Sequence, residues 1–407
     1  MFRHREQPTE LWQKNLMILW FGVFMMGIGF SEVMPFLSLY IDTLGDFTTN
    51  QLNFYSAVIF SIAFLTTAFT APLWGRLADA KGRKLMLLRA SLGMAIIFAL
   101  MGTATEVWHL ILLRAIQGVF GGFISNATAL VATQTPKDHT GYAMGVVVTG
   151  TTAGQLIGPF IGGTLASLTG FRMTFFVTGV IFFLVFLLVL FGIHEEFVPT
   201  LKEDAPSLKQ VVQQLPHARL TLGLFITTMM IQIVNFSITP IISLFVRQLN
   251  NTPISVTFLA GVVAAMPGIA TLLVASKFGA LGDKVGTQRM VMLGFLLTVL
   301  VLVPTAFVTA VWQLALFRFL IGIADATMLP AVQTLLSKTT PKAITSRIFA
   351  YNQSFQAIGS VAGPMFGTAV AFYFGYQGIF IASALLVGAT AFVFRRVTKD
   401  VDLSNAA

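Results

Sequence analysis

Apolar runs of about 20 residues or more recur along the whole chain, each long enough to cross the roughly 30 Å hydrocarbon core of a bilayer. Of the 407 residues, 56% are hydrophobic and only 10% are charged, whereas a soluble domain carries roughly 25% charged residues. A backbone in lipid must satisfy its hydrogen bonds internally, so continuous runs predict helices, because barrel strands are about 10 residues long with alternating polarity. The sequence therefore predicts an all-α membrane protein with twelve transmembrane helices. No signal-peptide cleavage site follows the first run, which we expect to be retained as a span. The predicted spans are residues 16–41, 52–74, 85–105, 108–131, 143–167, 173–194, 219–247, 255–277, 289–309, 312–337, 346–373 and 377–395.

Basic residues indicate the orientation of these spans. Nearly all of the 25 lysines and arginines fall on one side, in the termini and in short loops. Arg172 and Arg247 fall on the other side, and Arg114 and Arg318 lie within spans. Short loops rich in lysine and arginine stay in the cytoplasm, so we expect both termini and the central loop to be cytoplasmic. Topology thus explains the net charge of +9, which does not indicate a nucleic-acid partner.

The two halves of the chain repeat each other on either side of a long polar loop. We expect an N-terminal six-helix bundle at residues 1–194, a cytoplasmic central loop at 195–218 and a C-terminal six-helix bundle at 219–407. Parallel repeats of six spans, with substrate bound between the halves, are a known transporter design. Glycine, proline, arginine and aspartate residues recur in register in the two halves. The matching pairs are Pro35 and Pro240, Gly75 and Gly279, Asp79 and Asp283, Gly82 and Gly286, Arg114 and Arg318, Gly154 and Gly359, Gly158 and Gly363, Pro159 and Pro364, and Gly162 and Gly367.

The loop after the second span carries a motif of small, acidic and basic residues. It combines Gly75, Asp79 and Gly82 with the basic residue Arg83, and a second copy contains Asp283 but lacks the basic pair after its last glycine. The motif resembles the signature loop of the major facilitator superfamily, and the resemblance extends over nearly the whole chain. It implies the major facilitator fold and a latch on the cytoplasmic side, weaker in the second copy. The alternative is that the basic residues serve topology alone.

Two further motifs lie in the fourth and fifth spans. A mid-span arginine such as Arg114 costs about 3 kcal/mol on insertion scales and usually marks a function or an ion pair. In the superfamily this arginine belongs to a motif associated with proton transfer, which also directs attention to Arg318. The run Gly154, Gly158-Pro159 and Gly162 forms a smooth helix face, and its spacing is similar to the antiporter motif of the drug:proton antiporter branch. Within that branch the chain resembles twelve-span multidrug exporters of Gram-positive bacteria, of the fluoroquinolone-efflux kind.

Two acids lie inside spans, Glu32 in the first and Asp325 in the tenth. A carboxylic acid shielded from water favours its protonated form, so such an acid can carry a proton. We expect Glu32 and Asp325 to couple transport to protons, with Arg114 and Arg318 modulating them. The alternative is that each acid reaches water or a base near a span end. Pro35 follows Glu32 closely and is expected to break its helix.

Polar and aromatic residues of the spans are candidates for binding substrate, although polar side chains also join helices and phenylalanines also pack. The candidates are Glu32, Phe36, Asn126, Gln232, Asn235, Phe236, Asp325 and Gln353.

The sequence excludes several other functions. Cysteine is absent, and the five histidines lack ligand spacing, so no metal site is expected. No ATP-binding loop, catalytic elbow or cofactor motif occurs, so we expect neither an enzyme nor a cofactor. The predicted function is a proton-coupled secondary multidrug efflux transporter of a bacterial plasma membrane. We expect a monomer, with protons, amphiphilic cationic or zwitterionic drugs and lipid as its partners. The alternatives are an exporter or facilitator of a metabolite such as a sugar or amino acid, and a lipid scramblase or membrane sensor.

Overall fold

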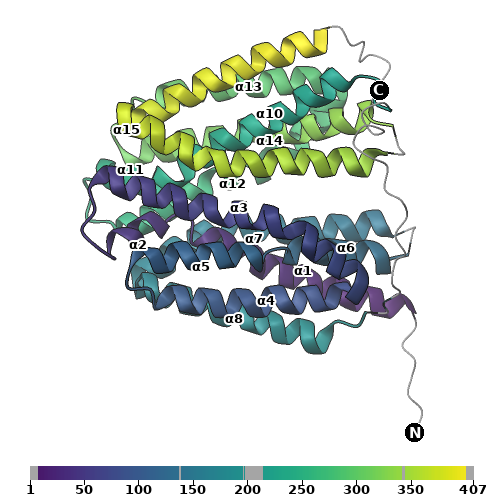
Figure 1. Ribbon diagram of the computed structural model, residues 1–407. Coiled ribbons are helices and arrows are strands. Elements are labelled where there is room, and N and C mark those ends of the chain that lie inside the picture. Colours follow the sequence, from purple (N-terminus) through teal and green to yellow (C-terminus); the bar gives the residue numbers. More distant parts are fainter. Residues whose placement is uncertain (1–7, 137–138, 196, 198–213, 342–343, 400–407) are drawn as a thin grey trace. The chain divides into compact units, whose positions relative to one another are not determined.

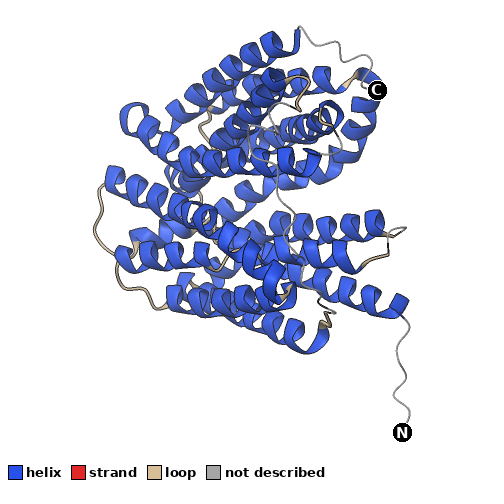
Figure 2. Cartoon of the chain, turned by 45° about the vertical axis from the view of Figure 1, so that its right-hand side comes forward, coloured by secondary structure: helices blue, strands red, loops and turns tan. Residues whose placement is uncertain are grey.

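A computed structural model describes residues 8–136, 139–195, 197, 214–341 and 344–399; the side chains of residues 8–10, 275–276, 279–280, 282–284, 346 and 399 are not described. All regular structure in these ranges is helical (Figure 2). The helices are α1 (Pro8–Glu32), α2 (Leu37–Asp42), α3 (Thr49–Lys81), α4 (Arg83–Gly102), α5 (Val107–Val119), α6 (Phe123–Gln134), α7 (Thr140–Thr169), α8 (Phe171–Gly192), α10 (Ala218–Ile238), the short 3-10 helix η1 (Thr239–Ile241), α11 (Ile242–Leu249), α12 (Val256–Val285), α13 (Thr287–Thr305), α14 (Val311–Thr339) and α15 (Thr345–Lys399). They are coloured in chain order in Figure 1.

Membrane-spanning helices account for nearly all of this structure. Within the described ranges, 11 helical segments are long and apolar enough to cross a bilayer. One of them, α15, is two helices joined at Gly375, whose φ of +69° interrupts the helical backbone. The predicted all-α membrane fold is therefore confirmed, and the two helices of α15 bring the number of spans to twelve, with the kink between the last two predicted spans.

Three of the predicted spans contain a break in the helix. The first ends as α1 at Glu32 and resumes as α2 at Leu37, and the seventh passes from α10 through η1 to α11. These two breaks contain Pro35 and its repeat Pro240, and a proline removes a backbone donor. The break at Pro35 was expected, whereas the seventh span was predicted as one continuous run. The fourth span was predicted as one continuous run, but it divides into α5 and α6 at residues 120–122. Gly122 there has a φ of +98°, a conformation that favours glycine.

Contacts divide the chain into two compact units, residues 1–45 with 65–201, and residues 46–64 with 202–407. The first part of α3 thus belongs with the second unit. There the hydroxyl of Ser61 donates to the carbonyl of Val361 at 2.8 Å, and Thr368 donates to the carbonyl of Asn53 at 3.1 Å. The predicted bundles, by contrast, were continuous in sequence, with boundaries at residues 194 and 219. Most of the central loop between them lies outside the described residues.

Candidate functional site

Glu32 is the last residue of α1, and its side chain is enclosed within the first unit. Only 1% of its surface is exposed. The hydroxyl of Thr178 on α8 forms a hydrogen bond with the Glu32 carboxyl. The same hydroxyl is placed to donate to the carbonyl of Thr174 at 2.8 Å. Glu32 thus has a polar partner in an interior otherwise rich in phenylalanine, including Phe182, which stacks edge-on against Phe98 at 5.0 Å.

The glycines of α7 determine where α1 lies. A Cβ atom added at Gly154, Gly158 or Gly162 would overlap atoms of α1, including the carbonyl oxygen of Glu32 in the case of Gly162. α7 remains helical through Pro159. The glycine run therefore permits backbone-to-backbone contact between α1 and α7, and this contact fixes the position of the Glu32 backbone.

The second unit repeats this contact without an acid. Gly359, Gly363 and Gly367 of α15 approach α10, and a Cβ atom at Gly367 would overlap the carbonyl oxygen of Ser237. Ser237 stands in the repeat position of Glu32, and its hydroxyl lies 3.4 Å from that of Ser383, which is the repeat partner of Thr178. An acid–hydroxyl pair in one half thus corresponds to a hydroxyl–hydroxyl pair in the other.

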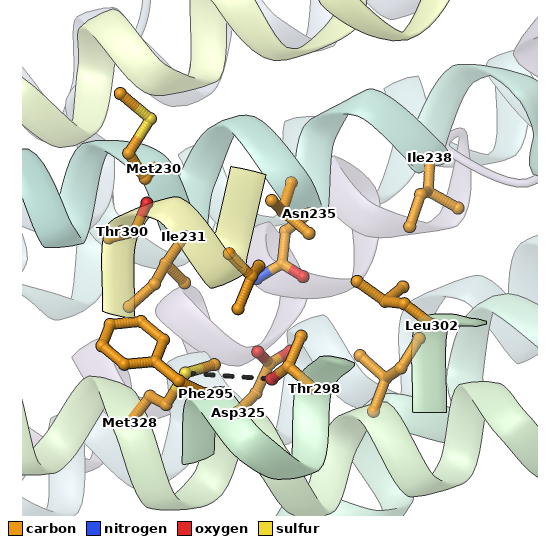
Figure 3. Close-up of a pocket in the computed structure, with 13 residues that line it drawn as sticks. Met230, Ile231, Asn235, Ile238, Phe295, Thr298, Leu302, Asp325, Met328 and Thr390 are labelled. Carbon is orange, nitrogen blue, oxygen red and sulfur yellow. Dashed lines mark hydrogen bonds between the residues drawn. The ribbon is translucent and has the colours of Figure 1, made fainter. Parts of the chain in front are cut away.

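Asp325 of α14 lies beside Asn235 of α10 in the second unit. The Asn235 side chain interacts with the Asp325 carboxylate, and Figure 3 shows the two side chains converging from their helices. They line a small cavity with room for about one water molecule. The polar side chains at this cavity, apart from these two, are Thr298 and Thr390, and its apolar wall includes Phe295. Asp325 is thus the acid with access to a cavity.

Both predicted span arginines are buried. Arg114 is 4% exposed, and its Nη1 donates to the Gln117 side chain at 2.8 Å on the same helix. Arg318 is 8% exposed, and its Nε and Nη1 have no hydrogen-bond partner among the described residues. Asp325 lies two turns further along α14 and attracts Arg318 electrostatically. Arg318 and Asp325 therefore belong to one polar cluster, whereas Arg114 is bonded within its own helix.

The signature loop joins α3 and α4. Asp79 forms an ion pair with Arg83 at 3.5 Å, with the two side chains 58% and 26% exposed respectively. Gly75 has open space where a Cβ atom would lie, and Gly82 has a φ of +93°. In the second copy the side chain of Asp283 lies outside the described residues.

Glu195, at the end of the sixth span, is a partner that the sequence motifs did not indicate. Its carboxylate accepts hydrogen bonds from the backbone N–H groups of Arg83 and Lys84 at 2.8 and 2.7 Å. These N–H groups open α4, where a negative charge is favoured by the helix dipole. The N-terminus of α4 is therefore capped by Glu195, whereas Asp79 pairs with the Arg83 side chain. An acid just after an apolar span is the only sequence signal for this role.

The predicted substrate-lining residues are dispersed. Phe36 is fully buried and packs against Phe171 and Phe175 at 5.7 Å. Phe236 packs edge-on against Phe64 at 4.9 Å. Phe36 therefore lies in a packed interior.

The polar candidates other than Asn235 divide between the two units. Asn126 donates to the carbonyl of Gly122 at 2.7 Å and lines a cavity between α3, α5 and α6. Gln232 is partly exposed on α10, and Gln353 is exposed on α15. Asn235 alone joins one of the two acids.

Two repeated sets of six spans, with discontinuous helices and buried acids, define the class of polytopic transporters built from parallel repeats. The sequence matches the Major Facilitator Superfamily over residues 19–266 and 224–406, so the chain belongs to this family of membrane transporters.

Two relatives of high sequence identity support the assignment to this family. "Multidrug resistance protein MdtG" of Salmonella dublin is 46% identical over 376 residues, covering 92% of this chain and 93% of its own. The protein of the same name from Dickeya zeae is 47% identical over 381 residues, covering 94% and 93%. Both organisms are Gram-negative, whereas the motifs were compared above with exporters of Gram-positive bacteria.

Solved structures share the fold at low sequence identity. A bacterial homologue of the human lysosomal transporter Spinster, in an inward-facing and occupied conformation, has a TM-score of 0.79 at 15% identity, over 97% of this chain and 98% of that one. The nucleoside transporter NupG has a TM-score of 0.79 at 15% identity, over 94% and 99%.

Proposed function

We propose that this chain is a proton-coupled multidrug efflux transporter that exports amphiphilic, cationic or zwitterionic compounds. The observation that carries the proposal is 46% identity, over 92% of the chain, with a protein named for multidrug resistance. At such identity over a whole chain, the substrate class is expected to be shared. The apolar, phenylalanine-rich spans, with 39 phenylalanines in all, suit amphiphilic compounds better than sugars, which need many hydrogen bonds.

Proton coupling is supported by the hydrogen bonds at Glu32. A hydroxyl has one hydrogen, yet that of Thr178 contacts both the Glu32 carboxyl and the Thr174 carbonyl. Both contacts are satisfied together when a protonated Glu32 donates to Thr178 and Thr178 donates to Thr174. Loss of that proton removes one hydrogen bond and leaves a buried charge, which favours a rearrangement of α1. In this proposal Glu32 carries the proton.

Asp325 is proposed to serve the cationic substrate. It is paired with Asn235 at a cavity and lies within electrostatic reach of Arg318. A cation bound near Asp325 stabilises the ionised carboxylate. Protons and substrate would then compete, and such competition yields antiport.

The remaining parts of the proposal concern the membrane. Both termini and the central loop are proposed to be cytoplasmic, because the basic residues collect on their side. Asp79 and Arg83 are proposed to latch this side during the cycle, with Gly75 as a further member of the latch motif. Gly82, with its positive φ, allows the chain to turn between α3 and α4. The working unit is proposed to be a monomer in the plasma membrane.

Transport by purified protein tests the proposed function. The protein is reconstituted in liposomes, a pH gradient is imposed, and movement of a cationic dye is followed with and without a protonophore. We expect gradient-dependent movement that the protonophore abolishes and that non-fluorescent drugs inhibit. Gradient-dependent movement of a sugar or amino acid, with no drug transport, would instead support a metabolite transporter.

A further inference from the structure

The break in the fourth span exposes backbone carbonyls in the middle of a membrane protein. α5 ends at Val119, and α6 begins at Phe123. In a continuous helix the carbonyls of residues 119–121 would accept N–H groups four residues further along. Lipid offers no replacement donors, so irregular backbone at this depth requires partners from the protein.

Trp74 of α3 and Arg89 of α4 supply these partners. The indole Nε1 of Trp74 donates to the carbonyl of Val119 at 2.7 Å. The Nη2 of Arg89 donates to the carbonyl of Gly121 and contacts that of Phe120 at 3.5 Å. Each of the three carbonyls at the break therefore has a side-chain donor. The positive charge of Arg89 also lies at the end of α5, where the helix dipole favours a cation.

Arg89 and Trp74 also contact each other directly. The guanidinium carbon of Arg89 lies 3.9 Å from the centre of the Trp74 ring. Its Nε and Nη1 are buried without a hydrogen-bond partner, and the ring face provides a cation–π contact in their place. Phe120, at the break, packs against α4, because a Cβ atom at Gly93 of α4 would overlap its ring. Trp74, Arg89, Gly93 and Phe120 are therefore in contact around the break.

The second unit provides a comparison within the same chain. Thr67 donates to the carbonyl of Gly118 at 3.0 Å, and its repeat partner Thr271 donates to that of Gly322 at 3.0 Å. The contact between these spans is therefore the same in both halves. However, α14 continues without a break through the equivalent position.

The donors are missing where the helix is unbroken. The repeat partners of Trp74 and Arg89 are Phe278 and Leu293, neither of which has a side-chain hydrogen-bond donor. Side-chain donors at these two positions thus occur only in the N-terminal half, where the break leaves backbone carbonyls without helical partners. This correlation argues that Trp74 and Arg89 serve the break and not the general contact between spans.

We propose that Arg89, together with Trp74, is a positioning residue that holds the break open and sets the direction in which α6 leaves it. The role in transport rests on the proposed function. α6 carries Ser125 and Asn126 to a cavity that Asp79 and Arg83 also line. The direction of α6 therefore determines the shape of the cavity at the proposed latch. Trp74 lines this cavity, whereas Arg89 is not among its lining residues.

Hydrogen exchange of the full-length protein in lipid nanodiscs tests the positioning role. In Arg89→Gln, we expect amides of residues 119–126 to exchange at least about tenfold faster, as for a lost hydrogen bond to a charged group. Trp74→Phe keeps the ring but loses the Val119 bond, so a smaller acceleration in the same segment is expected. Residues 107–117 of α5 should be unchanged in both variants.

Arg172 offers a matched control. It also donates from Nη2 to a backbone carbonyl at a span end, that of Ala104, at 3.2 Å. Arg172→Gln should accelerate exchange around residues 102–106 and leave residues 119–126 at the wild-type rate. In the dye assay, Arg89→Gln should lower the maximal rate with an unchanged KM, and Arg89→Lys should restore part of it.

The outcomes separate this role from a general loss of folding and from a failure of the proposed function. Wild-type exchange at residues 119–126 in both Arg89→Gln and Trp74→Phe overturns the inference, even if transport falls. Faster exchange over the whole first unit in Trp74→Phe, the variant that keeps an aromatic ring at this position, also overturns it. If the wild-type protein transports no drug, the proposed function fails, and the exchange results still decide the role of Arg89.

Discussion

The hydroxyl of Thr178 and the carboxyl of Glu32 form a buried hydrogen bond between α8 and α1. The second unit has two serine hydroxyls 3.4 Å apart at the equivalent positions. The two halves therefore share one packing arrangement, and a titratable group replaces a hydroxyl in only one of them. The contact between α1 and α8 therefore contains a titratable group that the equivalent contact in the second unit lacks.

Replacing the Glu32 carboxyl should uncouple transport from the pH gradient. Glu32→Gln keeps the size and a donor for Thr178 but removes the titration, so we expect dye efflux that no longer rises as the gradient increases. Thr178→Val should weaken the coupling and destabilise the protein by about 1–3 kcal/mol, the cost of an unsatisfied buried polar group. Ser237→Ala is the control at the repeat position and should retain gradient dependence. Efflux by Glu32→Gln that follows the gradient as in wild type would exclude Glu32 as the proton carrier.

Asp325 should matter more for cationic than for neutral substrates. Asp325→Asn removes the charge but keeps a polar side chain of similar size beside Asn235, so we expect the KM for a cationic dye to rise by about tenfold, equivalent to roughly 1.4 kcal/mol. A neutral amphiphilic substrate should be affected much less. Thr390→Val, at the same cavity, is the control. Equal losses for charged and neutral substrates would contradict the proposed role.

The glycines facing α1 should tolerate no side chain. Gly158→Ala would place a methyl group against Ser31 and the backbone of α1, and overpacking of this kind costs about 1–3 kcal/mol. We expect a lower unfolding temperature in detergent and slower efflux. Gly145→Ala lies on the same helix with nothing within 4 Å, so it should behave as wild type. Equal stability of the two variants would argue against close packing of α7 on α1.

The two copies of the signature loop should differ in importance. Asp79→Asn removes the ion pair with Arg83, and we expect inserted protein with several-fold slower transport because the balance between inward and outward states shifts. Asp283→Asn should have a smaller effect, since its loop lacks the basic pair. Transport assays at matched expression measure both, and an equal loss would refute the inferred asymmetry.

Orientation can be measured directly because the chain has no cysteine. A cysteine introduced at Lys338 should resist an impermeant thiol reagent in intact cells and react after lysis, since this exposed position lies on the basic side. A cysteine at the exposed position Thr105 should react without lysis. The reverse pattern would overturn the predicted topology.

Local features of the sequence were sufficient for the spans and for the helix break at Pro35, and the repeat of Pro35 as Pro240 marks the position of a second break. Long apolar runs allow only helices in lipid, and Pro35 and Pro240 interrupt helices by their own chemistry. The repeated glycines also indicated which helix faces permit close contact. Each of these effects depends on residues near one another in the chain.

Contacts between distant segments were decided only by the tertiary structure. Thr178 follows Glu32 by 146 positions, and nothing in either span distinguishes this threonine from others. Glu195 lies 112 positions from Arg83, the residue whose N–H it accepts. The break at Gly122 was missed because the apolar run continues through it, and the carbonyls it frees are satisfied by Trp74 and Arg89 from other helices. A sequence pattern reports burial and periodicity, whereas the pairing of one donor with one acceptor depends on how the helices pack.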